Sequence, residues 1–424
     1  MTESRSLKIF LYLLLIVLPL RESFAVMIGE STPIRFGEML MALCPIFYFV
    51  IKEEYEAPDN ITSYLIFSFL AYSLIVGVGF AELLQPAFAA KYFIRGVFFF
   101  VLIRIAETKV IFISEEFVEL LFKYTVIIEA IFCLMQMFGY TLLFGELGPY
   151  NASVTFGFQR LSGTASEPGY LIPIITPCIY YFTSDLYKYK YWAIASGIIT
   201  ILSLSTFGYV ALLVVILIRL YVSYRDLIVK SILVSGLSIM FALVTVLVLF
   251  PQVRDVYEGI STKVMAFSSF DEDDMDYSGA ERAENLLVAT EAFLEDSGER
   301  MVLGQGIGAT AHHTENNVVF FKPAEEANNL FLSVIINQGL IGLILLLLVF
   351  FSIFRQIRMT DSSMAFFVGF LIQLLQYFIV GNLWLYFFWI YIFFIIVLNR
   401  QQVLEEEYIE DLEQETGQDD TYNL

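Results

Sequence analysis

Polar side chains interrupt one of the most apolar stretches of the chain. Residues 327–351 read ANNLFLSVIINQGLIGLILLLLVFF, with Asn328 and Asn329 at the start and an Asn-Gln-Gly triplet at 337–339. Amides at membrane depth are costly unless they meet a partner or a water-filled cavity. A helix N-terminus capped by asparagine also presents free N–H groups and a positive dipole end, which can bind an anion. We therefore expect Asn328 or Asn329 to cap a membrane helix whose N-terminal end forms the bottom of a polar cavity. The alternative is that the asparagine only caps the helix at the membrane surface.

A second candidate is Arg282, which lies in the soluble-like stretch upstream. Ser278 and Glu281 form a capping box. Apolar residues then follow the i, i+3, i+4, i+7 spacing of an amphipathic helix that would end near Gly298. Arg282 would lie in the first turn, where a cation opposes the helix dipole at a cost on the order of a few tenths of a kcal/mol. This arginine is therefore either a second contact for an anion or a surface arginine paired with a nearby carboxylate.

Glycines and histidines lie between these two candidates, in the segment 302–313 (VLGQGIGATAHH). Gly304 and Gly306 resemble a dinucleotide-binding fingerprint only superficially, because no strand precedes them and no helix clearly follows. They predict a tight turn that brings the backbone close to another segment. His312 and His313 could supply a base, although paired histidines in an acidic loop are more often incidental.

Two charged residues and one acidic run near the predicted spans could also act chemically. Arg95 could contact a phosphate or extend to the lipid headgroups. Glu129 lies near mid-membrane, where an ionisable side chain is functional by default; it could pair with a basic residue or line a cavity. The acidic run 271–276 resembles half a calcium loop, but Asn285 replaces the closing glutamate. The sequence therefore predicts no metal site.

The elements that must position these residues are membrane helices. The chain of 424 residues is 58% hydrophobic, has a mean hydropathy of +0.72 and a net charge of -20. Apolar runs of about 17–25 residues recur, the length that crosses a bilayer as a helix. We predict an all-α polytopic membrane protein with about twelve spans: 7–28, 34–51, 61–80, 89–106, 117–139, 168–184, 190–205, 207–222, 228–250, 329–353, 363–380 and 383–399. The first span could instead be a signal peptide.

Charge sets the expected orientation and excludes some functions. With the N-terminus inside, thirteen basic residues fall in short cytoplasmic segments: Arg5, Lys8, Lys52, Arg104, Lys109, Lys188, Lys190, Arg219, Arg225, Lys230, Arg355, Arg358 and Arg400. Only five fall outside: Arg21, Arg35, Lys91, Arg95 and Arg160. This bias predicts cytoplasmic N- and C-termini. The acidic balance excludes a nucleic-acid-binding surface, and three scattered cysteines exclude a disulfide framework or a metal knuckle.

Four regions follow from this pattern. Residues 1–250 would form nine spans with a short external loop at 140–167. Residues 251–328 would form a large external loop with the amphipathic helix, and a loop of that length in a compact fold is usually functional. Residues 329–400 would form the last three spans, and 401–424 an acidic, disordered cytoplasmic tail.

The segments SGAER, LGQGIG and ANNLFLSVIINQGLIGLILLL together resemble the signature of the O-antigen polymerase and O-antigen ligase superfamily. In that family an arginine opens a loop helix, a Gly-x-Gly turn and an x-Asn pair follow, and a Leu and a Gly-Leu-x-Gly helix complete the pattern. The matching residues here are Arg282, Gly304, Gly306, Asn328, Asn329, Leu330, Gly339 and Gly342. The segment 159–175 resembles the family's Arg-x-x-Gly and Glu-Pro entry to the sixth span, which implies Arg160 as another functional arginine.

The resemblance implies a GT-C-like enzyme of the bacterial inner membrane. Such an enzyme would transfer glycan from a polyprenyl diphosphate carrier to a sugar hydroxyl at the outer face, without a metal or other cofactor. Arg282 and Arg160 would be catalytic, because arginines can neutralise the charge that develops on a leaving pyrophosphate. Asn328, Asn329, Arg95, Gly304 and Gly306 would bind substrate.

One departure from the family separates the alternatives. Ligases of the superfamily carry histidine where Asn328 stands, and asparagine cannot accept a proton, so the sequence favours a polymerase. An O-antigen ligase or a protein O-oligosaccharyltransferase is the alternative. A lipid-linked-oligosaccharide flippase is less well supported, because no repeat of broken spans relates the two halves; a non-catalytic scaffold would not need the arginines. The expected partners are a polyprenyl-diphosphate-linked oligosaccharide, membrane lipid and a chain-length regulator protein.

Overall fold

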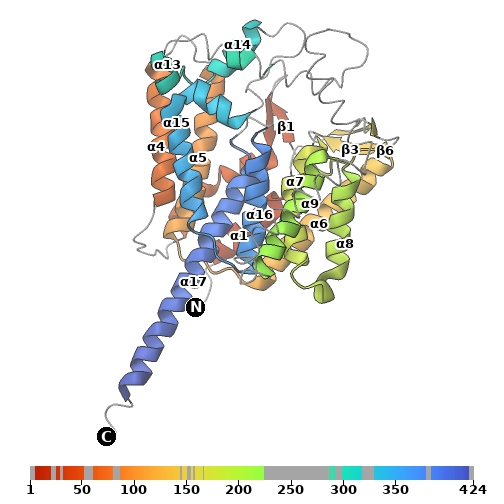
Figure 1. Ribbon diagram of the computed structural model, residues 1–424, viewed down its shortest axis with the longest axis vertical. Coiled ribbons are helices and arrows are strands. Elements are labelled where there is room, and N and C mark those ends of the chain that lie inside the picture. The colour runs from red at the N-terminus through yellow and green to blue at the C-terminus, as the bar shows by residue number, and fades with distance from the viewer. Residues whose placement is uncertain are drawn as a thin grey trace, which may run out of the picture.

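The computed structural model describes residues 5–20, 25–28, 32–51, 61–79, 86–143, 146–149, 154–155, 158–165, 167–223, 285, 288–291, 298–317, 329–378 and 383–419. Most of these residues are helical (Figure 1). The helices are α1 (Arg5–Val17), α2 (Phe36–Met41), α3 (Cys44–Val50), α4 (Ile61–Gly79), α5 (Pro86–Thr108), α6 (Glu115–Met137), α7 (Pro168–Phe182), α8 (Leu186–Leu202), α9 (Thr206–Ser223), α13 (Gly298–Leu303), α14 (Ala309–Asn317), α15 (Leu330–Phe354), α16 (Asp361–Gln376) and α17 (Tyr386–Asp419).

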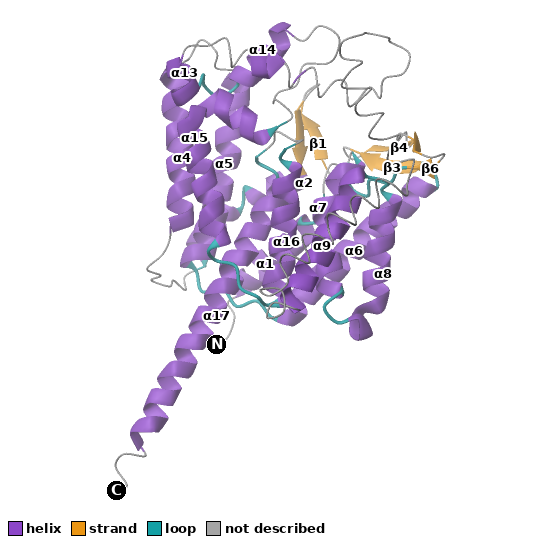
Figure 2. Cartoon of the chain, viewed as in Figure 1, coloured by secondary structure: helices purple, strands orange, loops and turns teal. Residues whose placement is uncertain are grey.

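Among the described residues, three short antiparallel hairpins correct the all-α expectation to a mostly helical fold. They pair β1 (Ala25–Ile28) with β2 (Thr32–Arg35), β3 (Tyr140–Leu143) with β4 (Glu146–Pro149), and β5 (Val154–Thr155) with β6 (Phe158–Gln159). Figure 2 shows strands β1, β3, β4 and β6 at the same end of the helix bundle as α13 and α14. We call this the loop end, and we call the opposite end, where α1 begins and α17 leaves the bundle, the terminal end.

Described helices stand at eleven of the twelve predicted spans, and the ninth, 228–250, lies outside the described residues. The first span was predicted too long, since α1 ends at Val17 and residues 25–28 are a strand. Pro19 explains the early end, because a residue before proline avoids the helical conformation. Among the described helices, α4, α15 and the Tyr386–Glu406 part of α17 are long and apolar enough to cross a membrane. The chain is an integral membrane protein, and twelve crossings remain a prediction.

The bundle has two groups of helices joined by a central pair. Helices α4, α5 and α15 pack together on one side, and α6, α7, α8 and α9 form the other (Figure 1). Helix α16 packs on α7 and α17, while α17 also packs on α5. The pair α16 and α17 therefore connects the group that carries α15 to the group that carries α7.

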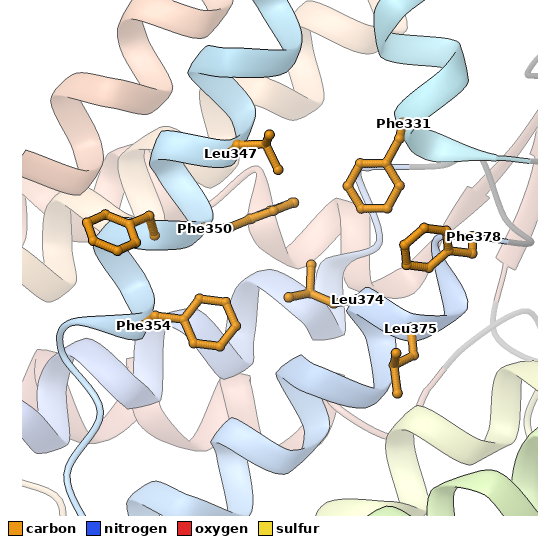
Figure 3. Close-up of a pocket in the computed structure, with 8 residues that line it drawn as sticks. Phe331, Leu347, Phe350, Phe354, Leu374, Leu375 and Phe378 are labelled. Atoms are coloured by element: carbon orange, nitrogen blue, oxygen red, sulfur yellow. The ribbon is translucent and has the colours of Figure 1, made fainter.

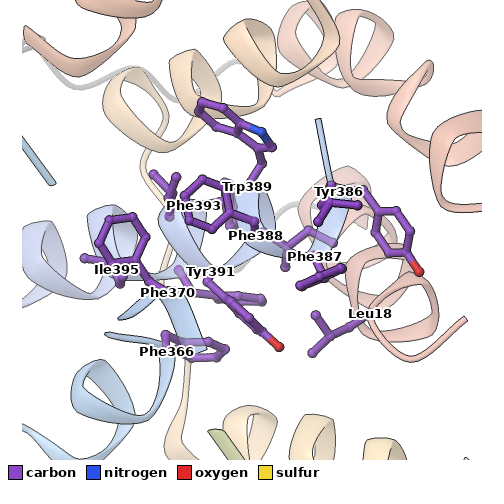
Figure 4. Close-up of a cluster of buried hydrophobic side chains, with 14 of the residues drawn as sticks. Leu18, Phe366, Phe370, Tyr386, Phe387, Phe388, Trp389, Tyr391, Phe393 and Ile395 are labelled. Atoms are coloured by element: carbon purple, nitrogen blue, oxygen red, sulfur yellow. The ribbon is translucent and has the colours of Figure 1, made fainter. Parts of the chain in front are cut away.

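Helix α17 forms the centre of the bundle. Its side chains from Phe387 to Ile396 are all buried, on every face of the helix, as expected for a helix that is apolar all round. Figure 4 shows Phe366 and Phe370 of α16 among these side chains, and the rings of Phe370 and Phe388 stack at 5.2 Å. The indole of Trp389 donates to the Leu383 carbonyl at 3.0 Å, so the one polar atom of that side chain is satisfied.

Two prolines inside α7 tie this helix to the central pair. A proline removes the hydrogen bond to the carbonyl four residues earlier, so Pro173 and Pro177 free the carbonyls of residues 169 and 173. Gln376 of α16 donates to the Gly169 carbonyl at 3.0 Å. Tyr391 of α17 donates to the Pro173 carbonyl at 2.8 Å. Polar side chains from neighbouring helices thus replace the bonds that the prolines remove, which fixes how α7 sits against α16 and α17.

Candidate functional site

Helix α15 is two helical segments joined by a break. Gly339 has φ 68° and ψ -171°, a non-helical conformation inside the run. We call residues 330–338 the first segment of α15. Asn329 caps it, because its side-chain oxygen accepts the Leu332 N–H at 3.0 Å. The Asn-Gln-Gly triplet singled out in the sequence therefore marks the point where the membrane helix is interrupted.

The glycine turn after α13 docks on this break. A broken helix leaves carbonyls without intrahelical partners, and here the Gln305 N–H donates to the Ile336 carbonyl and the Gly306 N–H to the Asn337 carbonyl, both at 2.9 Å. Gly304 and Gly306 have φ of 92° and 101°, which a residue with a Cβ rarely adopts. The predicted close approach of backbone is therefore confirmed, and its target is α15. The expectation that no helix follows the turn was wrong, since α14 begins at Ala309.

The contact at the break is too close for any side chain. A Cβ added to Gly304 would lie 2.5 Å from the Gln338 carbonyl carbon, and one added to Gly339 would lie 2.3 Å from the Val302 oxygen. The two glycines face each other across the same backbone contact. Both the turn and the helix break thus depend on residues without a Cβ.

Side chains of the triplet and of neighbouring helices fix the docked turn. The Asn337 side-chain oxygen accepts the Thr310 N–H at 3.2 Å. Gln338 donates to the Tyr92 hydroxyl of α5 at 3.3 Å, and the Tyr72 hydroxyl of α4 donates to the Leu303 carbonyl at 2.8 Å. The polar residues inside this apolar run are therefore engaged in holding the loop, which is the reason that the helix carries them.

The predicted amphipathic helix also reaches the first segment of α15. Residues 285 and 288–291 of that helix are helical, and Ala289 is buried in a small cluster with Ala309 and Ile336, against which Leu332 packs. Ser278 and Arg282 lie outside the described residues. Gly298 begins α13 instead of ending the amphipathic helix.

His312 and His313 lie beside the glycine turn. The Nε2 atom of His313 is 2.7 Å from the Gln305 side-chain oxygen, and the two imidazole rings are 5.9 Å apart. Both side chains are half-buried. A histidine held next to the turn could act as a base, and this role stays a prediction.

The capped end of α15 meets the C-terminal end of α16. The Leu330 N–H donates to the Tyr377 carbonyl at 2.9 Å, and the Asn329 side chain donates to the Phe378 carbonyl at 3.2 Å. The preceding residue of α16, Gln376, holds the Gly169 carbonyl in the first turn of α7. The N-terminal ends of α15 and α7 therefore both contact the same short stretch at the C-terminal end of α16, residues 376–378. Asn328 lies outside the described residues.

The loop that contains Arg160 leads into α7, and two side chains of α6 bind its backbone. Gln136 accepts the Ser162 and Gly163 N–H groups at 2.9 and 3.0 Å and donates to the Gly163 carbonyl at 2.7 Å. Glu129 accepts both the N–H and the hydroxyl of Thr164 at 2.9 Å. Both α6 side chains are fully buried. We call these two residues the α6 clamp; it fixes the backbone just after Arg160, whose own side chain is half-buried.

Arg95 has a different environment from the one expected. Its guanidinium lies 2.6 Å from a carboxylate oxygen of Glu38 in α2, and both side chains are mostly buried. This ion pair joins α2 to α5, and a contact of Arg95 with phosphate or with the lipid headgroups stays a prediction. Glu129, expected to pair with a basic residue or to line a cavity, belongs to the α6 clamp.

Several residues of this arrangement were not singled out in the sequence. Gln136, Tyr72 and Tyr92 lie alone in apolar runs and match no spacing rule, so no local signal distinguishes them. Gln376 could have been suspected from the two prolines of α7, which require donors from another helix. Among the described residues, no group of three or more His, Cys, Asp or Glu side chains is placed to hold a metal ion.

Residues 192–347 match a protein-family model described as O-antigen ligase. The match includes Arg282, the glycine turn and the first segment of α15, whereas Arg160 lies before it. No curated protein matches the chain. Members of the matched family are glycosyltransferase-like enzymes that act on lipid-linked sugars in surface polysaccharide assembly. The match over residues 192–347 makes this part of the chain similar to the O-antigen ligase and polymerase superfamily and supports the resemblance noted in the sequence.

Proposed function

We propose that the protein polymerises a lipid-linked surface polysaccharide at the outer face of the bacterial inner membrane. The observation that carries this proposal is that the family match spans the glycine turn and the broken helix on which it docks. The donor would be a polyprenyl-diphosphate-linked oligosaccharide of the O-antigen or capsule type, and the acceptor a hydroxyl of a second glycan.

The chemistry needs little beyond charge neutralisation. The acceptor hydroxyl attacks the anomeric carbon, the bond to the diphosphate oxygen breaks, and the hydroxyl proton passes to a base. Preorganised positive groups stabilise the charge that develops on the leaving diphosphate. The N-terminal ends of α15 and α7 would supply the positive ends of their helix dipoles, and Arg160 and Arg282 would supply guanidinium groups that can form paired hydrogen bonds to phosphate. Asn329, with Asn328 before it, would contact the diphosphate, and Gly304 and Gly306 would shape the cavity.

The base is assigned to the histidine pair. His313 is held by Gln305 at 2.7 Å within the docked turn, and His312 adjoins it. Arg95, whose guanidinium lies beside Glu38, stays a proposed substrate contact through its remaining N–H groups.

Polymerisation is favoured over ligation by Asn328, because asparagine cannot replace the histidine that ligases of this superfamily use. The second candidate function is therefore transfer of a finished glycan by an O-antigen ligase or a protein O-oligosaccharyltransferase. The glycan profile of a deletion strain separates them. Loss of chains longer than one repeat supports polymerisation, complete chains that stay on the carrier support ligation, and loss of every external repeat would point to a flippase.

Orientation is proposed from the basic residues, with both termini in the cytoplasm. A cysteine at Ser268 in the long loop should react with an impermeant reagent added outside intact cells. A cysteine at Met359, which is exposed between α15 and α16 at the terminal end, should react only after the membrane is opened. Labelling of Met359→Cys from outside would reverse the arrangement and place the loop end in the cytoplasm.

A further inference from the structure

The outward face of α6 forms an apolar stripe along the helix. Its exposed side chains recur at helical spacing, and the stripe ends just beyond the helix: Leu120, Ile127, Ile131, Leu134, Met137 and Phe138. Helix α6 has 23 residues. At 1.5 Å per residue it extends roughly 35 Å, which is close to the thickness of a hydrocarbon core, about 30 Å. On an integral membrane protein, an exposed apolar stripe of this length faces the bilayer.

Apolar surface also reaches the loop end between α15 and α16. Figure 3 shows a groove there that is lined by phenylalanine and leucine side chains only. One of them, Phe378, follows α16 at the loop end and is 59% exposed. Phe138 follows α6 at the same end and is 79% exposed. The apolar surface of the bundle therefore extends to the loop-end limit of both helices.

The hairpin of β3 and β4 begins directly after the stripe of α6. The Phe138 N–H still bonds to the Leu134 carbonyl at 3.2 Å, and the Gly139 N–H bonds to the Gln136 carbonyl at 2.9 Å. Gly139 has φ 82°, as in the common glycine stop of a helix, and β3 starts at Tyr140. The start of the hairpin is therefore fixed at the end of α6.

The two faces of this hairpin differ in exposure. Residues directly opposite each other in an antiparallel pair share a face, so one face carries four apolar side chains, Tyr140 with Pro149 and Leu142 with Leu147. Tyr140 is 57% exposed and Leu147 66%, Pro149 is exposed and Leu142 is half-buried. On the other face, Thr141 is buried. The face turned away from the protein thus consists of apolar side chains without a charge.

We propose that this apolar face of the β3–β4 hairpin lies in the interfacial layer of the bilayer at the loop end. The occupant follows from continuity, because the face begins two residues after a stripe that contacts hydrocarbon. Tyrosine suits this depth, since its ring is apolar and its hydroxyl can reach water. A face of four side chains is also smaller than the roughly 800 Å² that each partner buries in a stable protein–protein interface.

The hairpin then anchors the loop that carries Arg160. That loop begins with β3 and β4 and, after β5 and β6, reaches Arg160 and the backbone bound by the α6 clamp. One end of the loop is held by the membrane surface and the other by α6, which keeps Arg160 beside the bilayer. A contact of Arg160 with a lipid-linked diphosphate rests on the proposed function, whereas the location of the hairpin does not.

Spin labels can report the surroundings of the hairpin directly. A nitroxide is attached to Leu147→Cys in the full-length protein in phospholipid nanodiscs. Its collision rates are measured with oxygen, which concentrates in the bilayer, and with a water-soluble nickel chelate. Leu134→Cys on the stripe of α6 is the bilayer control, and Glu299→Cys, at an exposed position of α13, is the water control. The native cysteines are all buried, and wild-type protein treated in the same way gives their background.

The ratio of oxygen to nickel collisions at Leu147→Cys should lie between those of the two controls and nearer to that of Leu134→Cys. This is the result expected for an apolar face that enters the boundary between headgroups and acyl chains by about 5–10 Å. Tyr140→Cys lies on the same face and should give the same result, so a folding defect at one position still leaves a test at the other.

Two results would overturn the membrane anchor. A ratio equal to that of Glu299→Cys would place the face in water, and low collision rates with both reagents would mean that protein, such as a second copy of the chain, covers it. Neither result bears on the proposed function, because the measurement uses no substrate. Polymerisation is rejected instead if the deletion strain still makes chains longer than one repeat.

Discussion

Two loops that carry candidate site residues are held to the membrane helices by opposite means. The central contact of the glycine turn is between backbones, since its N–H groups bond to carbonyls at the break in α15 and its glycines leave no room for a side chain; the Asn337 and Tyr72 side chains add hydrogen bonds beside it. The Arg160 loop is held by the α6 clamp, in which buried Gln136 and Glu129 grip backbone groups from an unbroken helix. A close contact between two backbones leaves no room for an added side-chain atom on either segment. In the α6 clamp, by contrast, side chains bind backbone groups, so substitutions in the loop should be tolerated and substitutions of Gln136 or Glu129 should not. The two loops should therefore respond to different substitutions.

The largest expected effect is at the backbone contact. Gly339→Ala adds a Cβ 2.3 Å from the Val302 oxygen at a φ of 68°. Left-handed backbone in a residue with a Cβ and the forced displacement together should cost roughly 3 kcal/mol or more. Thermal unfolding of the purified protein should show a large drop in the midpoint, or the protein should fail to accumulate.

A glycine in an open position is the control for this effect. Gly197 in α8 has nothing within 4 Å of its Cβ position, and alanine is favoured over glycine in a helix by about 1 kcal/mol. Gly197→Ala should keep or slightly raise the midpoint. Equal stability of the two variants would show that the docked turn is not a rigid contact.

The α6 clamp should give the next largest effect. Gln136→Leu keeps the approximate size of the side chain but leaves the N–H groups of Ser162 and Gly163 and the Gly163 carbonyl buried without their partner. Each unsatisfied group costs about 1–3 kcal/mol, and relaxation of the loop should limit the total to roughly 2–3 kcal/mol. Leu134→Ala, at a 53% exposed position of the same helix, should change the midpoint little. A clamp variant as stable as this control would contradict the assignment.

Much of the glycine turn could be predicted from the sequence, whereas for the α6 clamp the sequence marked only Glu129, as an ionisable side chain at membrane depth, and not the backbone that it binds. The polar triplet at 337–339 and the glycines at 304 and 306 each mark an irregular backbone, so an irregular contact was expected at both. Their pairing could not be predicted, because more than thirty residues separate them in the sequence. Gln136 stands alone in an apolar helix, where a buried glutamine and a lipid-facing one have the same local pattern. Likewise, Arg95 pairs with Glu38 of another helix, and the hydropathy of the sequence does not indicate which residues pair between helices.

The arginines should affect activity more than stability. If each forms a forked contact to the diphosphate, lysine keeps the charge but loses the paired geometry. Arg282→Lys and Arg160→Lys should then lower the rate about tenfold, and the alanine variants up to about a hundredfold. The control is Arg358→Ala at the terminal end, whose ion pair with Glu406 spans 3.6 Å and is exposed. Glycan chain length and protein level are measured together, and normal chains in Arg282→Ala at normal expression would remove Arg282 from the site.

Asn329 offers the smallest effect on stability and separates a helix cap from an anion contact. Asn329→Ala removes the cap and should cost about 1 kcal/mol. Asn329→Asp loses the bond that Asn329 donates to the Phe378 carbonyl, but it keeps an oxygen for the Leu332 N–H and its negative charge is favourable at a helix N-terminus. Its unfolding midpoint should therefore fall less than that of Asn329→Ala. The same charge would repel a diphosphate bound there. If Asn329 serves only as a cap, Asp should keep more stability than Ala and leave the chain length unchanged. If the capped end of α15 binds the donor, Asp should keep more stability than Ala and still raise the donor concentration needed for half-maximal polymerisation. A measurement of the unfolding midpoint and of donor dependence for the two variants decides between a cap alone and a cap that also borders the site.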